Sequence, residues 1–257
     1  MIKFSKNVDI KGSQLLLSFT SVGLTGNFAS SLIINNNKFE NIGFLFSHYL
    51  SAYVGTNPQT GTALYNGQVY FNEEKKIILI NFHAGVAHHF RNDFCKELLE
   101  IYTTNSFRGI FIYGGIGRGF LNDEELRNPN VDIYYLTNDS QFDGSQFFLK
   151  SFEKLVQMEN KKKEFEEVKY LDQVGLAKHL IKFFNKKKIT FHYLFAFSSE
   201  LFDPLAGLAV YYKLSLLLGF SKENNVIAKN VGNLNSFMDK VESQFKVEPT
   251  WRLFLKE

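Results

Sequence analysis

Residues 110–120 read IFIYGGIGRGF, an apolar run that passes directly into closely spaced glycines. The run Ile110, Phe111, Ile112 is typical of a strand buried on both faces, as in parallel sheets covered by helices. A glycine turn directly after such a strand can bring backbone amides against a phosphate. The stretch therefore raises two hypotheses: a phosphate-binding loop of a nucleotide-using protein, or a flexible turn without a ligand.

Further apolar runs predict the other strands of this sheet. They are short and do not alternate between apolar and polar residues, which is expected where helices cover both faces of a largely parallel sheet. These runs span residues 15–19, 42–46, 77–82, 109–113, 132–136 and 191–197. The dipeptide Asn66-Gly67, within residues 62–71, predicts the turn of a β-hairpin that forms an antiparallel excursion beside the main sheet.

Two apolar stripes at helical spacing predict helices that cover the sheet. The first runs from Phe94 through Tyr102, with Asp93 as its cap. The second begins with Asp203 as N-cap and Pro204 in the first turn, and ends at Gly219 in a left-handed conformation. Its stripe comprises Leu205, Leu208, Ala209, Tyr212 and Leu216. Strands and helices together predict an α/β fold, a three-layer α/β/α sandwich around a mostly parallel sheet.

The length of 257 residues is typical of one large domain, so residues 1–257 are expected to form a single unit. Residues 235–246 are predicted to be helical, and Pro249 ends that helix, which leaves residues 249–257 as an extended C-terminal tail. The charged run 157–170 predicts an exposed helix or a hinge.

The composition argues against several classes of partner. The formal net charge is only +3, and the basic residues cluster only at 161–163 and 186–188, so nucleic-acid binding is not expected. No run of 18 apolar residues predicts a membrane span, and the first residues lack the apolar segment of a secretory signal, so we expect a soluble, unexported chain. The lone Cys95 fits a reducing compartment and a buried position on a helix.

Motifs for catalysis are incomplete. In a dinucleotide fingerprint, Gly115 and Gly117 would be the first two glycines, but Phe120 stands at the third position, although Asp139 lies near the spacing of a ribose-binding acid. His83, His88 and His89 do not share one helix face, and Ser198 and Ser199 lack a nucleophile elbow. The sequence therefore predicts no enzyme, no catalytic residues, no metal and no cofactor. The alternative is a nucleotide- or nucleoside-binding α/β enzyme that uses the glycine-rich turns at 23–26 or 114–119.

Four stretches, taken in order, resemble the proteasome assembly chaperone 2 family. They are SVGLTGNFASSLII (21–34), IGFLFSHYLSAYVGTNP (42–58), FSSELFDPLAGL (197–208) and PTWRLFLKE (249–257). The resemblance implies an α/β/α fold and a non-catalytic chaperone that forms a heterodimer with proteasome assembly chaperone 1 and scaffolds the ring of proteasome α subunits. It also implies a cytoplasmic location and leaves the nucleus open as a second compartment.

The tail is the predicted partner-binding segment. Its apolar and polar residues alternate with the period of an extended strand, which can dock on a sheet edge or place its carboxylate in a basic pocket. The candidate residues are Trp251, Arg252, Leu253, Phe254, Leu255, Lys256 and Glu257. Docking between α subunits through a hydrophobic-Tyr-X ending is not matched, because Lys256 stands where Tyr is needed. In the other interpretation, Trp251 packs on the domain's own core.

Overall fold

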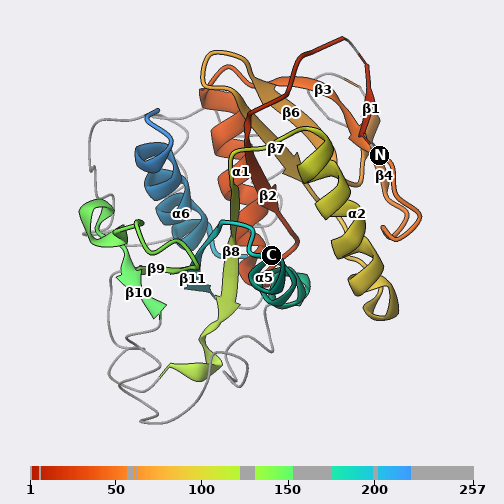
Figure 1. The fold of residues 1–257 in the computed structure, drawn as a ribbon. Coiled ribbons are helices and arrows are strands. Elements are labelled where there is room, and N and C mark those ends of the chain that lie inside the picture. The colour runs from red at the N-terminus through yellow and green to blue at the C-terminus, as the bar shows by residue number, and fades with distance from the viewer. Residues whose placement is uncertain are drawn as a thin grey trace.

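The structure is a computed structural model, and it describes residues 2–5, 7–56, 61, 63–121, 131–152, 175–198 and 202–220. Within these residues a nine-stranded sheet has the order β1-β3-β6-β7-β2-β8-β11-β9-β10, and β4 and β5 form a separate two-stranded sheet (Figure 1). The strands are β1 (Ile2–Phe4), β2 (Gln14–Ser18), β3 (Glu40–Leu45), β4 (Val54–Thr56), β5 (Ala63–Tyr65), β6 (Gln68–Asn72), β7 (Ile77–Asn81), β8 (Ile110–Gly117), β9 (Ile133–Thr137), β10 (Lys150–Ser151) and β11 (Phe191–Ser198).

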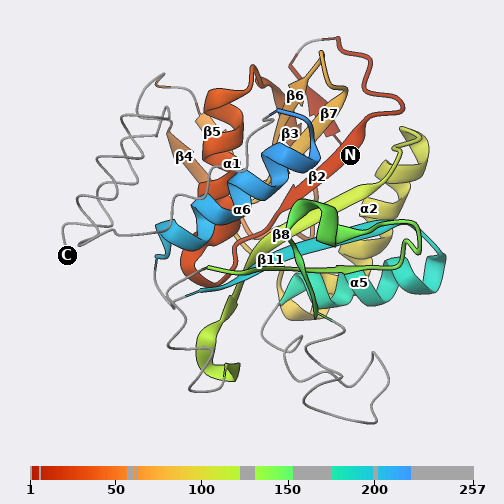
Figure 2. The ribbon, with the colours of Figure 1, turned by 90° about the vertical axis from the view of Figure 1, so that its left-hand side faces the viewer.

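Helices cover both faces of the large sheet, so the α/β/α prediction is confirmed. Helices α1 (Thr25–Asn36) and α6 (Pro204–Leu217) pack on one face, and α2 (Arg91–Thr104) and α5 (Leu176–Lys187) pack on the other (Figures 1 and 2). Short 3-10 turns are η1 (Val22–Leu24), η2 (His88–Phe90), η3 (Arg118–Phe120) and η4 (Gly144–Phe147). No helix of the described residues is long and apolar enough to cross a membrane.

The centre of the sheet is parallel, as the apolar runs predict. Strands β7, β2, β8 and β11 run in one direction, and antiparallel pairs extend the sheet on both sides of them. All residues of β7, β8 and β11 are buried, which explains why their sequences do not alternate. The predicted turn at 114–119 is wrong in one respect, because Gly114–Gly117 continue β8 and pair with β11.

The turn at Asn66-Gly67 lies where the sequence predicts it, but its two flanks do not pair with each other. Gly67 has a φ of 72°, while β5 pairs with β4 and β6 pairs with β3 and β7. The Asn66 side chain explains the difference. Its amide donates to the carbonyl oxygens of Ser51 (3.0 Å) and Ala84 (3.1 Å), and its oxygen accepts from the backbone of His83 (3.1 Å). The asparagine thus binds three chain segments together, which is not its usual role in a two-residue hairpin.

Of the two predicted helix starts, that of α2 needs correction and that of α6 is confirmed. Helix α2 begins at Arg91, directly after η2, so Phe90 holds the N-cap position; Asp93 lies in the first turn and pairs with Lys96 at 2.7 Å. Helix α6 begins as predicted, with the Asp203 carboxylate accepting from the Ala206 amide at 3.0 Å.

The buried face of α6 is not the predicted one. Gly207, Val210, Tyr211 and Leu214 are buried, whereas four of the five predicted stripe residues are only partly buried and Leu208 alone is fully buried. Lys213 is the only charged residue of this helix, so apolar spacing cannot identify its inner face. The inner face of α6 is set by its packing against α1, because a Cβ at residue 207 would lie 2.7 Å from a Phe28 ring carbon.

Glycines allow the start of α1 to rest directly on β8. A Cβ at Gly115 would lie 2.2 Å from the Val22 carbonyl oxygen, and a Cβ at Gly26 would lie 2.9 Å from the Tyr113 carbonyl oxygen. Both obstacles are backbone atoms, which cannot move aside like the end of a flexible side chain. The close contact of β8 with η1 and α1 therefore requires glycine at both positions.

Replacement of Gly115 by alanine is expected to force β8 and η1 apart. Overpacking costs about 1–3 kcal/mol, and the obstacle here is backbone, so we expect a loss of about 3 kcal/mol. This corresponds to a fall in Tm of about 6–12 °C for a chain of this size, measured by calorimetry. Gly119→Ala is the matched control, because nothing lies within 4 Å of its added Cβ. Equal Tm values for the Gly115→Ala and Gly119→Ala variants would contradict the close contact of β8 with η1.

Cys95 is fully buried on α2, as the sequence predicts, and burial raises the pKa of its thiol to about 12. The thiolate is the reactive form, so the native protein is expected to resist a thiol reagent at pH 8 and to react with one equivalent in denaturant. Rapid labelling of the native chain would contradict this placement.

Candidate functional site

The carboxyl ends of the parallel strands are the place where α/β proteins commonly bind ligands, and here the protein's own groups fill it. Ser21 Oγ accepts a hydrogen bond from the backbone N–H of Gly115 at 3.0 Å. A phosphate bound at a loop of β8 would need this amide as a hydrogen-bond donor. We call the contact region of residues 21–26 with residues 113–117 the β8–α1 junction.

Buried hydroxyl groups complete the β8–α1 junction. Thr25 Oγ1 and Ser198 Oγ lie 2.6 Å apart, and Thr25 also donates to the Val22 carbonyl oxygen at 3.0 Å. One turn further along α1, Ser30 Oγ lies 2.7 Å from the Tyr113 hydroxyl, and burial raises the pKa of Tyr113 above its ordinary value. These groups satisfy one another, so Ser198 is held as a structural hydrogen-bond partner with no exposed oxygen for nucleophilic attack.

Asp203 joins the β8–α1 junction to α6. Besides capping α6, its carboxylate lies 3.2 Å from Arg118 Nη2, and its backbone N–H donates to the Gly23 carbonyl oxygen at 2.9 Å. The Asp203 side chain is only 6% exposed, whereas that of Arg118 is 44% exposed, so water screens part of the ion pair. The charged groups at this end of the sheet thus connect elements of the fold.

The geometry of the 114–119 glycines does not match the phosphate loop of the nucleotide hypothesis. Gly114, Gly115 and Gly117 lie in β8, with Gly115 against the carbonyl oxygen of Val22, so no phosphate fits against Gly115; Gly119 follows in η3. The acid expected for a ribose, Asp139, follows β9, which runs antiparallel to β11. Thr137 pairs with His192 near the start of β11, so Asp139 lies at the opposite end of the sheet from Gly117.

The histidines do not form a metal site. The His83 ring stacks on Tyr53 with centroids 5.2 Å apart, and burial lowers the pKa of His83 to about 4. The His88 ring instead meets that of His179, at 6.0 Å. In the part of the chain that the structure describes, no three His, Cys, Asp or Glu side chains lie close enough to hold a metal ion.

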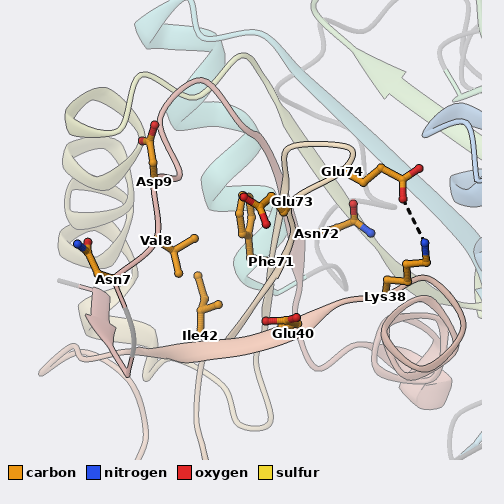
Figure 3. A pocket seen from close by; sticks show the side chains of 10 residues that line it. All are labelled: Asn7, Val8, Asp9, Lys38, Glu40, Ile42, Phe71, Asn72, Glu73 and Glu74. Atoms are coloured by element: carbon orange, nitrogen blue, oxygen red, sulfur yellow. Dashed lines mark ion pairs between the residues drawn. The ribbon is translucent and has the colours of Figure 1, made fainter.

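An open depression of about 590 Å³ lies between residues 7–9, β3 and β6 (Figure 3). Val8, Ile42 and Phe71 form its apolar part, and its charged residues are Asp9, Lys38, Glu40, Glu73 and Glu74. Lys38 and Glu74 are both well exposed and form an ion pair at 3.5 Å. The lining contains no histidine, cysteine or hydroxyl side chain, so it offers no Ser–His or Cys–His pair.

The predicted partner-binding residues Trp251–Glu257 lie outside the described residues, as does Ser199. Sequence analysis missed another set of exposed apolar residues, which lie around β3, β4 and β5: Phe46, Tyr53, Val54 and Tyr65. The signal that identifies them is the absence of any Asp, Glu, Lys or Arg between residues 41 and 72. We call the described part of residues 41–72 the charge-free surface.

Several proteins named proteasome assembly chaperone 2 are similar in sequence. The human protein is 26% identical over 149 residues, which is 56% of each chain, and the Nematostella vectensis protein is 25% identical over 211 residues, covering 76% of this chain and 84% of that one. The bovine protein is 25% identical over 126 residues, and the match covers 48% of the bovine chain. The match thus spans about half the length of the mammalian relatives.

Solved structures share the fold. The archaeal homologue of proteasome-assembly chaperone PbaA, from Pyrococcus furiosus, matches with a TM-score of 0.65 at 14% identity, covering 95% of this chain and 94% of that one. The archaeal proteasome activator PbaB from the same organism matches with a TM-score of 0.66 at 15% identity, covering 94% and 98%.

The sequence profile of the PAC2 family matches residues 15–230. This region runs from β2 through α6 and contains both sides of the β8–α1 junction. The chain therefore belongs to the PAC2 family.

Proposed function

We propose that this protein is a non-catalytic proteasome assembly chaperone that pairs with proteasome assembly chaperone 1 and scaffolds the assembly of the proteasome α ring. Family membership and the names of its relatives support the assembly role. The filled β8–α1 junction is the observation that carries the non-catalytic part, since the usual ligand position of an α/β sheet is occupied by Ser21, Thr25 and Ser198.

Such a protein acts by binding energy alone. A permanent partner completes the surface of the chaperone, and the pair then holds α subunits in an arrangement that favours ring closure over wrong pairing. Exposed aromatic side chains suit this role because they bury a large area for little loss of conformational freedom. We place this activity in the cytoplasm, with the nucleus as a second compartment.

Co-expression with proteasome assembly chaperone 1 tests the pairing. We expect one complex of equal stoichiometry on size-exclusion chromatography, and proteasome α subunits should co-purify with the tagged complex. Identification of the bound chains by mass spectrometry is the measurement. A stable monomer that retains neither partner would contradict the proposal.

Deletion of residues 251–257 tests the partner-binding role predicted for the tail. If the tail docks on another chain, its loss should reduce capture of the partner or of α subunits at least severalfold while leaving the Tm of the isolated chain unchanged. A lowered Tm with full capture would instead show that Trp251 packs on this domain's own core. Unchanged capture and unchanged melting together would remove any role for the tail.

A further inference from the structure

One long stretch of this chain carries no charge. Charged residues make up 21% of the sequence, so 32 residues would contain about seven, but residues 41–72 contain none, between Glu40 and Glu73. A stretch of this kind is expected in a buried core, yet part of this one is exposed. Val54 is 75% exposed and Phe46 is 47% exposed.

The exposed apolar groups of the charge-free surface are connected. Val54 on β4 pairs with Tyr65 on β5, and the Tyr65 ring stacks on Phe44 with centroids 4.5 Å apart. Phe46 directly follows β3, two residues after Phe44 and next to buried Leu45. Charged groups of other elements meet this surface at Phe46, where Lys3 Nζ lies 5.9 Å from the ring centroid, and at Ser47, which donates to the Glu97 carboxylate. Charge depletion with enriched aromatics and a polar rim is the composition of protein interfaces.

The charge-free surface is held in place from beneath. The buried Asn66 side chain ties Ser51 to the end of β7, and a Cβ at Gly67 would lie 3.1 Å from Leu45 Cβ. Tyr53 is fixed by its stack on His83. A surface whose residues are already positioned loses little conformational freedom when a partner binds.

Within the described residues, the small sheet in this surface consists of one strand pair. In the described residues β4 pairs only with β5, and β5 pairs only with β4. Two-stranded sheets are marginal in water and gain stability from a third strand or from packing. The outer edge of β4 can therefore accept an extended strand from another chain, whereas the Tyr65 amide of β5 already donates to Gln68 Oε1 at 3.0 Å.

We propose that the charge-free surface binds the permanent partner of this chain through an uncharged, apolar face that adds a strand to the β4–β5 sheet. The choice of partner rests on the proposed function, in which proteasome assembly chaperone 1 is the permanent partner and the α subunits are held only during ring assembly. Permanent interfaces are more apolar than those that must separate. A charged partner face is unfavourable here, since its charges would lose water without meeting an opposite charge.

Val54→Glu tests this surface with little risk to folding, because the side chain is 75% exposed on an outer strand. We expect the variant to bind co-expressed proteasome assembly chaperone 1 at least tenfold more weakly than wild type, with the Tm of the isolated chain unchanged. Phe148→Glu is the matched control. Phe148 is 67% exposed and adjoins β10 at the opposite edge of the large sheet from β1, so this variant should bind like wild type.

The outcomes separate this inference from the proposed function. If wild type fails to pair with proteasome assembly chaperone 1, the pairing and the choice of partner are both overturned. If wild type pairs and Val54→Glu pairs equally well, the surface assignment alone is overturned. If Val54→Glu keeps the partner but loses α subunits, the surface serves the released subunits, which also overturns the inference. Loss of the partner in both glutamate variants would show a nonspecific effect of charge and count against it.

Discussion

The contact between β8 and the start of α1 is the constraint on which the rest of the structure depends. Two glycines remove the side chains that would separate the elements, so the Val22 carbonyl oxygen lies directly over Gly115. Helix α1 is thereby fixed on the sheet, and α6 packs on α1 through Gly207. Asp203 completes the arrangement by capping α6 and binding the Gly23 carbonyl oxygen. Glycine thus acts here by permitting contact between protein elements.

The same contact determines where function can be located. With the carboxyl ends of β2, β8 and β11 closed by hydroxyl groups and backbone, the described part of the chain has no ligand position at the usual place for an α/β sheet. A connected group of exposed apolar residues lies instead around β3, near one end of the large sheet, and on the separate β4–β5 sheet. The molecule accordingly has a rigid closed centre and an uncharged surface near one edge, which suits lasting association with another protein.

Much of the fold is predictable from the sequence, and the exceptions have physical causes. The central strands are predictable because burial on both faces leaves few polar residues in them and no alternation between apolar and polar positions. The inner face of α6 is not, because a helix that is apolar almost all round has no periodic signal. Asn66-Gly67 predicts a turn but not the pairing of its flanks, which depends on side-chain hydrogen bonds to distant Ser51 and Ala84. The role of Gly115 also depends on an element 90 residues away in sequence, and no local pattern contains it.

Hydrogen–deuterium exchange with mass spectrometry tests the central claim most directly. The chain would be measured alone, with adenine, guanine and nicotinamide nucleotides, and in complex with its co-expressed partner. We expect nucleotides to leave exchange at residues 21–26 and 113–117 unchanged, and the partner to slow exchange within residues 41–56 and 63–72. Slower exchange at residues 21–26 and 113–117 with any nucleotide would contradict a closed junction and a function carried by the surface.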